Sequence, residues 1–225
     1  MFSRACLSGL CGFIFLTMTP APDTLVLVTS QDALGANDSA GWMQLGPDGT
    51  VLADTFTATS GGGVTVTGGL VGRDSLVSVV CPADSSCSWS GASAPNFNPG
   101  DSLIWTSDSG NGGNGPLTLT FSPSAAVGAA IQTDAPGAFT AQIDVYNGET
   151  LLGSLSEDSD ASGNALFIGV IDQDGPNISK LVVSVPSCVG DCTDFAVGTL
   201  YLNTSVQPTA KPSLIPVLRK RAGHF

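Results

Sequence analysis

One segment of the chain has the oxygen-donor spacing of a calcium-binding loop. Asp158, Asp160 and Ser162 alternate along it, and Gly163 stands in the sixth place, where such a loop turns sharply. Gly169 occupies the twelfth place, where a calcium loop carries a bidentate glutamate. The alternative is a polar hairpin turn, which we favour over calcium binding because the segment lies between two strand-like runs. Asp158, Asp160 and Ser162 are kept as a candidate calcium site.

Aromatic side chains are the second feature that could bind a ligand. Apolar faces of sugars stack on aromatic rings, while Asp and Asn side chains hold the hydroxyls. Trp89 is the leading candidate because it follows Cys87 in a Ser/Gly-rich stretch, and Trp42 is the next. Trp105 lies in a strand-like run, where burial is the ordinary outcome. The aromatic residues considered for stacking are Trp42, Trp89, Trp105, Tyr146 and Tyr201.

The sequence offers little for catalysis. His224 is the only histidine and stands next to last, so Ser-His-Asp and Cys-His mechanisms have no base in the folded part. A glycoside hydrolase needs two carboxyl groups at roughly 5 to 9.5 Å, and no pattern identifies such a pair. We therefore expect no catalytic residues, and a glycosidase that uses an Asp pair ranks last.

Four cysteines remain once a leader carrying Cys6 and Cys11 is removed, namely Cys81, Cys87, Cys188 and Cys192. An even count with local spacing predicts disulfides formed in an oxidising compartment. Of the three pairings we favour Cys81–Cys87 and Cys188–Cys192, because Pro82 and Gly190 let these short segments turn back. Each bridge stabilises by about 2 kcal/mol. Zinc is the alternative, although the spacings differ from common structural sites and no histidine is near.

The N-terminus has the layout of a secretory signal peptide. Arg4 precedes an apolar run from Ala5 to Met18, and a small residue, Ala21, ends it. The run is too short for a comfortable membrane anchor, and an uncleaved apolar N-terminus is the alternative. We expect a signal peptide over residues 1–21, one domain over 22–206 and a disordered basic tail over 207–225.

Charge is distributed unevenly. All 19 carboxylates lie between Asp23 and Asp194, whereas Arg73 and Lys180 are the basic residues of that stretch. Such a surface repels phosphate backbones and anionic lipids, which argues against nucleic acid or a membrane as partner after signal cleavage. Neutral glycans, exopolysaccharide and cations remain as ligands.

Period-two patterning recurs along the chain and predicts many short strands with one buried face. The content of 42% hydrophobic and 12% charged residues argues against disorder. No long segment has a helical period with caps. The sequence predicts an all-β fold, a jelly-roll-like sandwich of short antiparallel strands with little helix. The predicted strands are 24–28, 51–57, 64–67, 76–81, 102–106, 117–121, 139–146, 150–156, 165–171, 178–185 and 195–203.

Several segments resemble exported bacterial proteins of the PEP-CTERM, exosortase-sorted type. The segments are Gln44–Gly49 with Trp42, Gly137–Ile143, Leu151–Ser154, Phe167–Val170 and Asp194–Leu200. The last of them is also similar to the final strand of galactose-binding-like jelly rolls. The resemblance implies a bacterial β-sandwich at the cell surface or in the matrix.

The C-terminal tail departs from that family. Ala210-Lys211-Pro212 stands where the family has Pro-Glu-Pro, and about five apolar residues precede Arg219. We read the tail as a remnant of a sorting signal and expect release from the cell.

These observations favour a non-catalytic, secreted or cell-surface protein with a structural or matrix-associated role. A carbohydrate-binding, lectin-like module, assisted by calcium, is the alternative. A glycoside hydrolase is the third reading. No cofactor is expected apart from that calcium.

Overall fold

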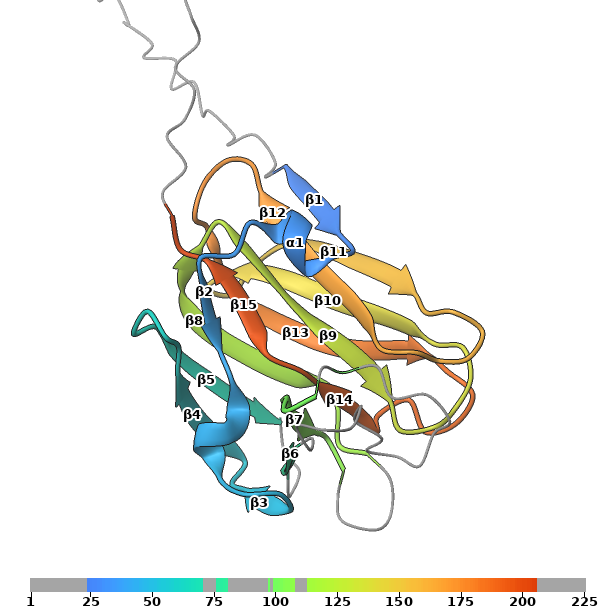
Figure 1. The fold of residues 1–225 in the computed structure, drawn as a ribbon. Helices are drawn as coiled ribbons and strands as arrows, with labels where there is room; N and C mark the ends of the chain where they lie inside the picture. The colour runs from blue at the N-terminus through green and yellow to red at the C-terminus, as the bar shows by residue number, and fades with distance from the viewer. Residues whose placement is uncertain (1–23, 71–75, 81–96, 98, 108–112, 206–225) are drawn as a thin grey trace, which may run out of the picture.

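The computed structural model describes residues 24–70, 76–80, 97, 99–107 and 113–205, and within them the protein is nearly all β. Two antiparallel sheets face each other (Figure 1). The helical elements of these ranges are the four-residue helix α1 (Gln31–Leu34) and the 3-10 turn η1 (Trp42–Leu45). No helix in the described ranges is long and apolar enough to cross a membrane. The predicted signal peptide and tail lie outside them.

The larger sheet has nine strands. Its main path runs β1 (Leu25–Val28), β12 (Leu166–Asp172), β9 (Ala126–Thr133), β14 (Phe195–Val197), β7 (Ser102–Trp105), β6 (Leu76–Val80) and β3 (Thr50–Leu52). Off this path, β15 (Leu200–Asn203) pairs with β9 and with β2 (Asp38–Ala40). Strand β9 therefore pairs with three strands, namely β12, β14 and β15.

The smaller sheet has six strands. In spatial order they are β11 (Thr150–Asp158), β10 (Thr140–Asn147), β13 (Ile178–Ser187), β8 (Leu117–Ser124), β5 (Thr65–Leu70) and β4 (Thr55–Thr59). The tight β10–β11 turn contains Gly148 at φ +56°, a left-handed conformation that favours glycine.

A single core joins the inner faces of the two sheets. In strand β10 alternate residues are buried, as Ile143 and Val145 show. They pack in one cluster with residues of the larger sheet such as Ile131 and Ile168. Fully burying each such side chain stabilises the fold by ~1.5–3 kcal/mol, so this cluster holds the sheets together.

The outer face of the nine-stranded sheet is partly covered as well. Leu34 of α1 and Phe167 lie over strands β9 and β12 at Gly128 and Gly169. A Cβ added at Gly128 would lie 2.8 Å from the Phe167 ring, and one at Gly169 would lie 2.9 Å from Leu34. Glycine is therefore needed at both positions for this second layer to approach the sheet.

The prediction of an all-β, two-sheet antiparallel sandwich is confirmed, while the finer jelly-roll assignment stays a prediction. Two predicted strands were each too long, because the chain changes partners within them. Residues 51–57 divide into β3 and β4 of different sheets, and residues 195–203 divide into β14 and β15. Strand β9 was not predicted at all.

Candidate functional site

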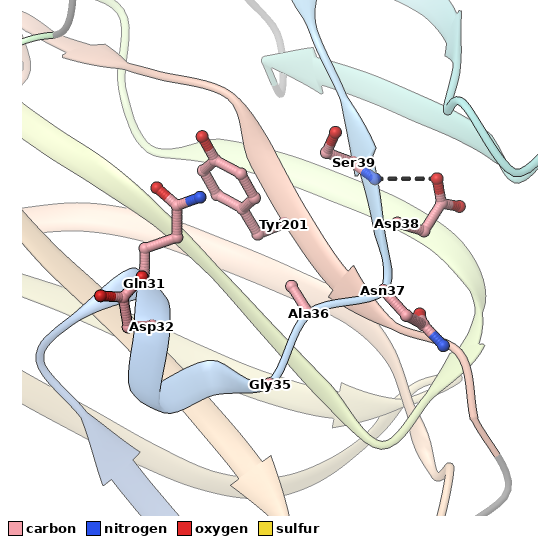
Figure 2. Close-up of a pocket in the computed structure, with 8 residues that line it drawn as sticks. All are labelled: Gln31, Asp32, Gly35, Ala36, Asn37, Asp38, Ser39 and Tyr201. Carbon is pink, nitrogen blue, oxygen red and sulfur yellow. Dashed lines mark hydrogen bonds between the residues drawn. The ribbon is translucent and has the colours of Figure 1, made fainter.

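A groove of about 400 Å³ opens on the outer face of the nine-stranded sheet (Figure 2). Helix α1 forms one wall, strand β2 forms the other, and Tyr201 of β15 stands between them. The lining residues are Gln31, Asp32, Gly35, Ala36, Asn37, Asp38, Ser39 and Tyr201. Aromatic, amide, hydroxyl and carboxylate groups thus gather in one hollow.

The turn after α1 fixes the first wall of the groove. Gly35 ends the helix at φ +63°, a left-handed conformation that glycine adopts without strain. The Gly35 carbonyl accepts a hydrogen bond of 2.8 Å from the Asn203 side chain on β15. Together with the burial of Leu34, this contact holds α1 beside Tyr201.

Tyr201 forms the floor of the groove. Its position on β15 pairs with Ser39 of β2, and its ring is tilted against Phe167 with 6.3 Å between the ring centroids. Burial raises the pKa of the Tyr201 hydroxyl, and the negative charge of Asp101 adds to the rise, while a hydrogen bond from Gln31 opposes it. The hydroxyl therefore stays neutral near pH 7 and can donate a hydrogen bond.

Asp38 lines the groove, but its carboxylate is hydrogen-bonded within the fold. Its Oδ1 accepts hydrogen bonds from the Gly62 and Ser39 amides, at 2.7 and 2.8 Å, and its Oδ2 accepts one of 2.5 Å from Ser60. Burial alone would raise the Asp38 pKa, but these bonds outweigh it and lower the pKa below its ordinary value. The carboxylate points to the far side of β2 from Tyr201, as Figure 2 shows, so it joins β2 to the β4–β5 hairpin.

Asn37 is likewise used within the fold. Its side-chain oxygen accepts a hydrogen bond of 3.0 Å from the Thr204 amide, and its nitrogen donates one of 2.6 Å to Ser205. What remains on the Tyr201 side of the groove is Gln31, Asp32 and Ser39, with Gln31 and Asp32 exposed at the rim. A flat ring beside exposed amide and carboxylate groups can bind one face of a sugar and its hydroxyls.

The interpretation of Trp42 as a stacking residue is wrong. Its side chain is fully buried, and its indole nitrogen donates a hydrogen bond of 2.7 Å to the Gly198 carbonyl. The ring meets Phe56 edge to face, with 6.0 Å between centroids. A tryptophan that anchors η1 to the core cannot meet a sugar. Trp89, the leading candidate, lies outside the described residues.

The candidate calcium segment forms a turn held by its own hydrogen bonds. Asp160 Oδ1 accepts hydrogen bonds from the Ser162 and Asn164 amides at 2.9 and 3.1 Å, and Asp158 Oδ1 accepts one of 2.6 Å from Thr140. The bond from the Asn164 amide is the largest cause of a lowered Asp160 pKa. Among the described residues no group of three or more His, Cys, Asp or Glu side chains could hold a metal ion. The arrangement is that of the polar turn, and calcium binding by Asp158, Asp160 and Ser162 stays a prediction.

One of the two predicted disulfides is present. Cys188 and Cys192 are bonded, with 5.5 Å between their Cα atoms. This bridge closes the segment between β13 and β14. Cys81 and Cys87 lie outside the described residues, so their pairing stays a prediction.

Sequence reasoning considered Tyr201 for stacking but did not place it in a site. Its neighbours Gln31 and Asp32 lie about 170 residues away in the chain, and no local pattern connects them to β15.

No protein-family model matches the chain, and no curated protein matches it significantly. The similarity to PEP-CTERM proteins therefore stays a prediction, and the site rests on its geometry.

Proposed function

We propose that this protein is a non-catalytic β-sandwich that works outside the cytoplasm and associates with extracellular polymer by binding neutral glycans in the groove over Tyr201. The observation that carries the proposal is the half-buried Tyr201 ring, held on the outer face of a sheet between exposed polar side chains. Rigid aromatic rings of this kind bind sugars at a small cost in conformational entropy.

Placement outside the cytoplasm is supported by two features. The N-terminus has a signal-peptide layout, and the Cys188–Cys192 bridge suits an oxidising compartment. The dense negative charge suits a protein that must stay dissolved there.

The charges near the groove select among sugars. Asp32 lies at its rim, and the charge of Asp101 acts on the Tyr201 hydroxyl. Uronate or sulfate groups would meet repulsion there, so neutral sugars fit better.

The experiment is a glycan array followed by calorimetric titration of the best neutral oligosaccharide. Tyr201→Ala should weaken binding at least about tenfold, or ~1.4 kcal/mol, whereas Tyr201→Phe should keep most of it. Tyr146→Ala is the matched control, because Tyr146 lies on the six-stranded sheet beneath Lys180.

Four results would contradict the proposal. No saturable binding to any glycan would favour a purely structural role. Equal binding by the wild type and Tyr201→Ala would move the site elsewhere, and loss of binding in Trp89→Ala alone would place it at Trp89. Turnover of a bound glycan would favour the glycosidase.

A further inference from the structure

Three neighbouring strands of the six-stranded sheet repeat threonine on their outer side. Strands β4, β5 and β8 lie side by side at one edge of that sheet (Figure 1). Residues between the threonines, such as Phe56 and Val66, are buried in the core, whereas the threonines themselves are exposed or half-buried. We call this surface the threonine face, and it consists of Thr55, Thr57, Thr59, Thr65, Thr67, Thr118 and Thr120.

The strand pairing aligns these residues in rows that cross the strands. Thr57 lies opposite Thr67, and Thr67 lies opposite Thr120. The row beside it consists of Thr55, Gly69 and Thr118. Side chains that face each other across a strand pair are about 4.5–5.5 Å apart at Cβ, and alternate residues along one strand are about 6.4–6.8 Å apart. Hydroxyl and methyl groups therefore recur at two regular intervals over the face.

The hydroxyl groups of the threonine face are not used within the fold. Elsewhere the fold does use threonine hydroxyls: those of Thr50, Thr106 and Thr193 each donate a hydrogen bond to a backbone carbonyl, at 2.6, 2.7 and 2.8 Å. Among the described residues, no hydroxyl of the threonine face has such a partner. These hydroxyls are therefore available to water.

The threonine face is neutral, although the chain carries 19 carboxylates. Strands β4, β5 and β8 contain no charged residue. Lys180 of β13 lies opposite Thr120, but its ammonium group lies 4.4 Å from the centre of the Tyr146 ring and 2.7 Å from Glu149. Its charge is thus directed toward β10, away from the threonine face.

Strand propensity alone is the ordinary explanation for threonine on a solvent-facing strand. It does not account for the unequal distribution of threonine over this sheet. On β10 and β11 the outward pairs are Gln142 with Ser156 and Asp144 with Ser154. Threonine is thus concentrated where three strands place it in register.

The chemistry of the threonine face restricts its partner. Sugars stack on aromatic rings, charged polymers need opposite charges, and stable protein interfaces are rich in aromatic residues, Met and Arg. None of these groups points outward from β4, β5 or β8. The face offers hydroxyls, which both donate and accept hydrogen bonds, and methyl groups, which water surrounds without bonding to them.

We propose that the threonine face binds the surface of ice. Threonine hydroxyls hold water molecules at the two intervals of the face, and these intervals are close to repeats of the oxygen lattice of ice. The held water can therefore join a crystal. Because neighbouring strands are rotated by about 20–25°, the match is confined to these three strands, and the expected activity is inhibition of recrystallisation rather than strong freezing-point depression. The Tyr201 groove takes no part in this binding.

The test follows the size of ice crystals in a frozen sucrose solution that contains the full, oxidised chain. The wild type should keep the crystals small. Thr67→Lys places a long charged side chain at the middle of the face and should abolish the inhibition. Thr67→Val keeps the shape but loses one hydroxyl, so the protein concentration needed should rise several-fold. Ser154→Lys is the matched control, because it adds the same charge at an exposed outward position of β11, and it should act like the wild type.

Slow freezing of the solution measures the binding directly. The wild type and Ser154→Lys should be enriched in the ice, whereas Thr67→Lys should stay in the liquid. Tyr201→Ala should keep full ice binding, and Thr67→Lys should keep glycan binding, so failure of this proposal is distinguishable from failure of the glycan site.

Exclusion of the wild type from ice overturns the proposal. Unchanged inhibition in Thr67→Lys, or in Thr67→Val if the lysine variant does not fold, overturns it as well. An equal loss in Ser154→Lys would assign the effect to charge rather than to the face. Retention of the wild type on a neutral solid polymer such as cellulose, abolished by Thr67→Lys and without binding to ice, would assign the face to that polymer instead.

Discussion

Asp38 begins strand β2 and Asp194 immediately precedes strand β14 of the same sheet, yet their surroundings shift the two pKa values in opposite directions. Asp38 receives hydrogen bonds from Ser60, Gly62 and Ser39, and its pKa is lowered despite burial. Asp194 receives a bond from an indole but faces other carboxyls, and its pKa is raised. The number of donors, rather than burial alone, decides which form of a carboxyl the fold stabilises.

The two carboxyl groups also differ in how closely the backbone approaches them. A Cβ at Gly62 would lie 2.7 Å from an Asp38 oxygen, so glycine is needed for the backbone to approach that carboxylate. Asp38 is thus a fixed anion that joins β2 to a hairpin of the opposite sheet. The Asp194 carboxyl instead accepts a bond from the Trp105 indole, and burial raises its pKa.

The largest effect should follow removal of the Asp38 anchor. Asp38→Ala leaves two amides and a hydroxyl without their charged acceptor, and we expect a loss of about 3 kcal/mol in the free energy of unfolding at pH 7. Urea denaturation would measure it, with Asp48→Ala as the control for a lost surface charge. A loss under ~1 kcal/mol would show that water replaces the carboxylate readily.

A smaller effect is expected at the Asp194 end when the covalent bridge is removed. Replacing Cys188 and Cys192 together by serine should cost about 2 kcal/mol, because the bridge closes a short loop. The same urea experiment measures it, with reduced wild type for comparison. The chemical shift of the Trp105 indole N–H, which donates to Asp194, should also change. Chemical-shift changes confined to residues around Asp38 would contradict the placement of the Cys188–Cys192 bridge beside Asp194.

Much of the fold follows from the sequence because half-buried strands alternate. The β10 pattern around Ile143 and the turn at Gly148 are readable without a structure. Strand β9 was missed because Ala126–Thr133 is rich in alanine and glycine, which have low strand propensity. The structure supplies the reason: β9 is covered on both faces, and small residues make room for Phe167 and α1.

Less of the site was predictable, because its residues come together only through strand pairing. Tyr201 meets Gln31 since β15 lies beside β2 and α1, and Asp134 meets Asp194 since β14 lies beside β9. Neither pair has a spacing that reports contact. The prediction that Trp42 stacks on a sugar failed for a related reason. Its sequence context is polar and glycine-rich, but the η1 turn directs its ring into the core.

The smallest effect concerns how stability depends on pH. A carboxyl whose folded pKa is raised binds its proton more tightly in the folded state, so its contribution is complete below the unfolded value of 3.8 and is lost as the pH rises toward about 7. Asp38 acts in the opposite sense, and its contribution is lost as the pH falls below 3.8.

Asp194→Asn should therefore flatten the decline in stability between pH 5 and 8, by on the order of 1 kcal/mol once solvent screening is allowed for. Calorimetric melting temperatures at several pH values would show it, with the variant at least as stable as the wild type at pH 8. Asp48→Asn should keep the wild-type slope. If Asp194→Asn instead melts lower at pH 8 and keeps that slope, the ionised Asp194 is stabilising, and the contrast with Asp38 disappears.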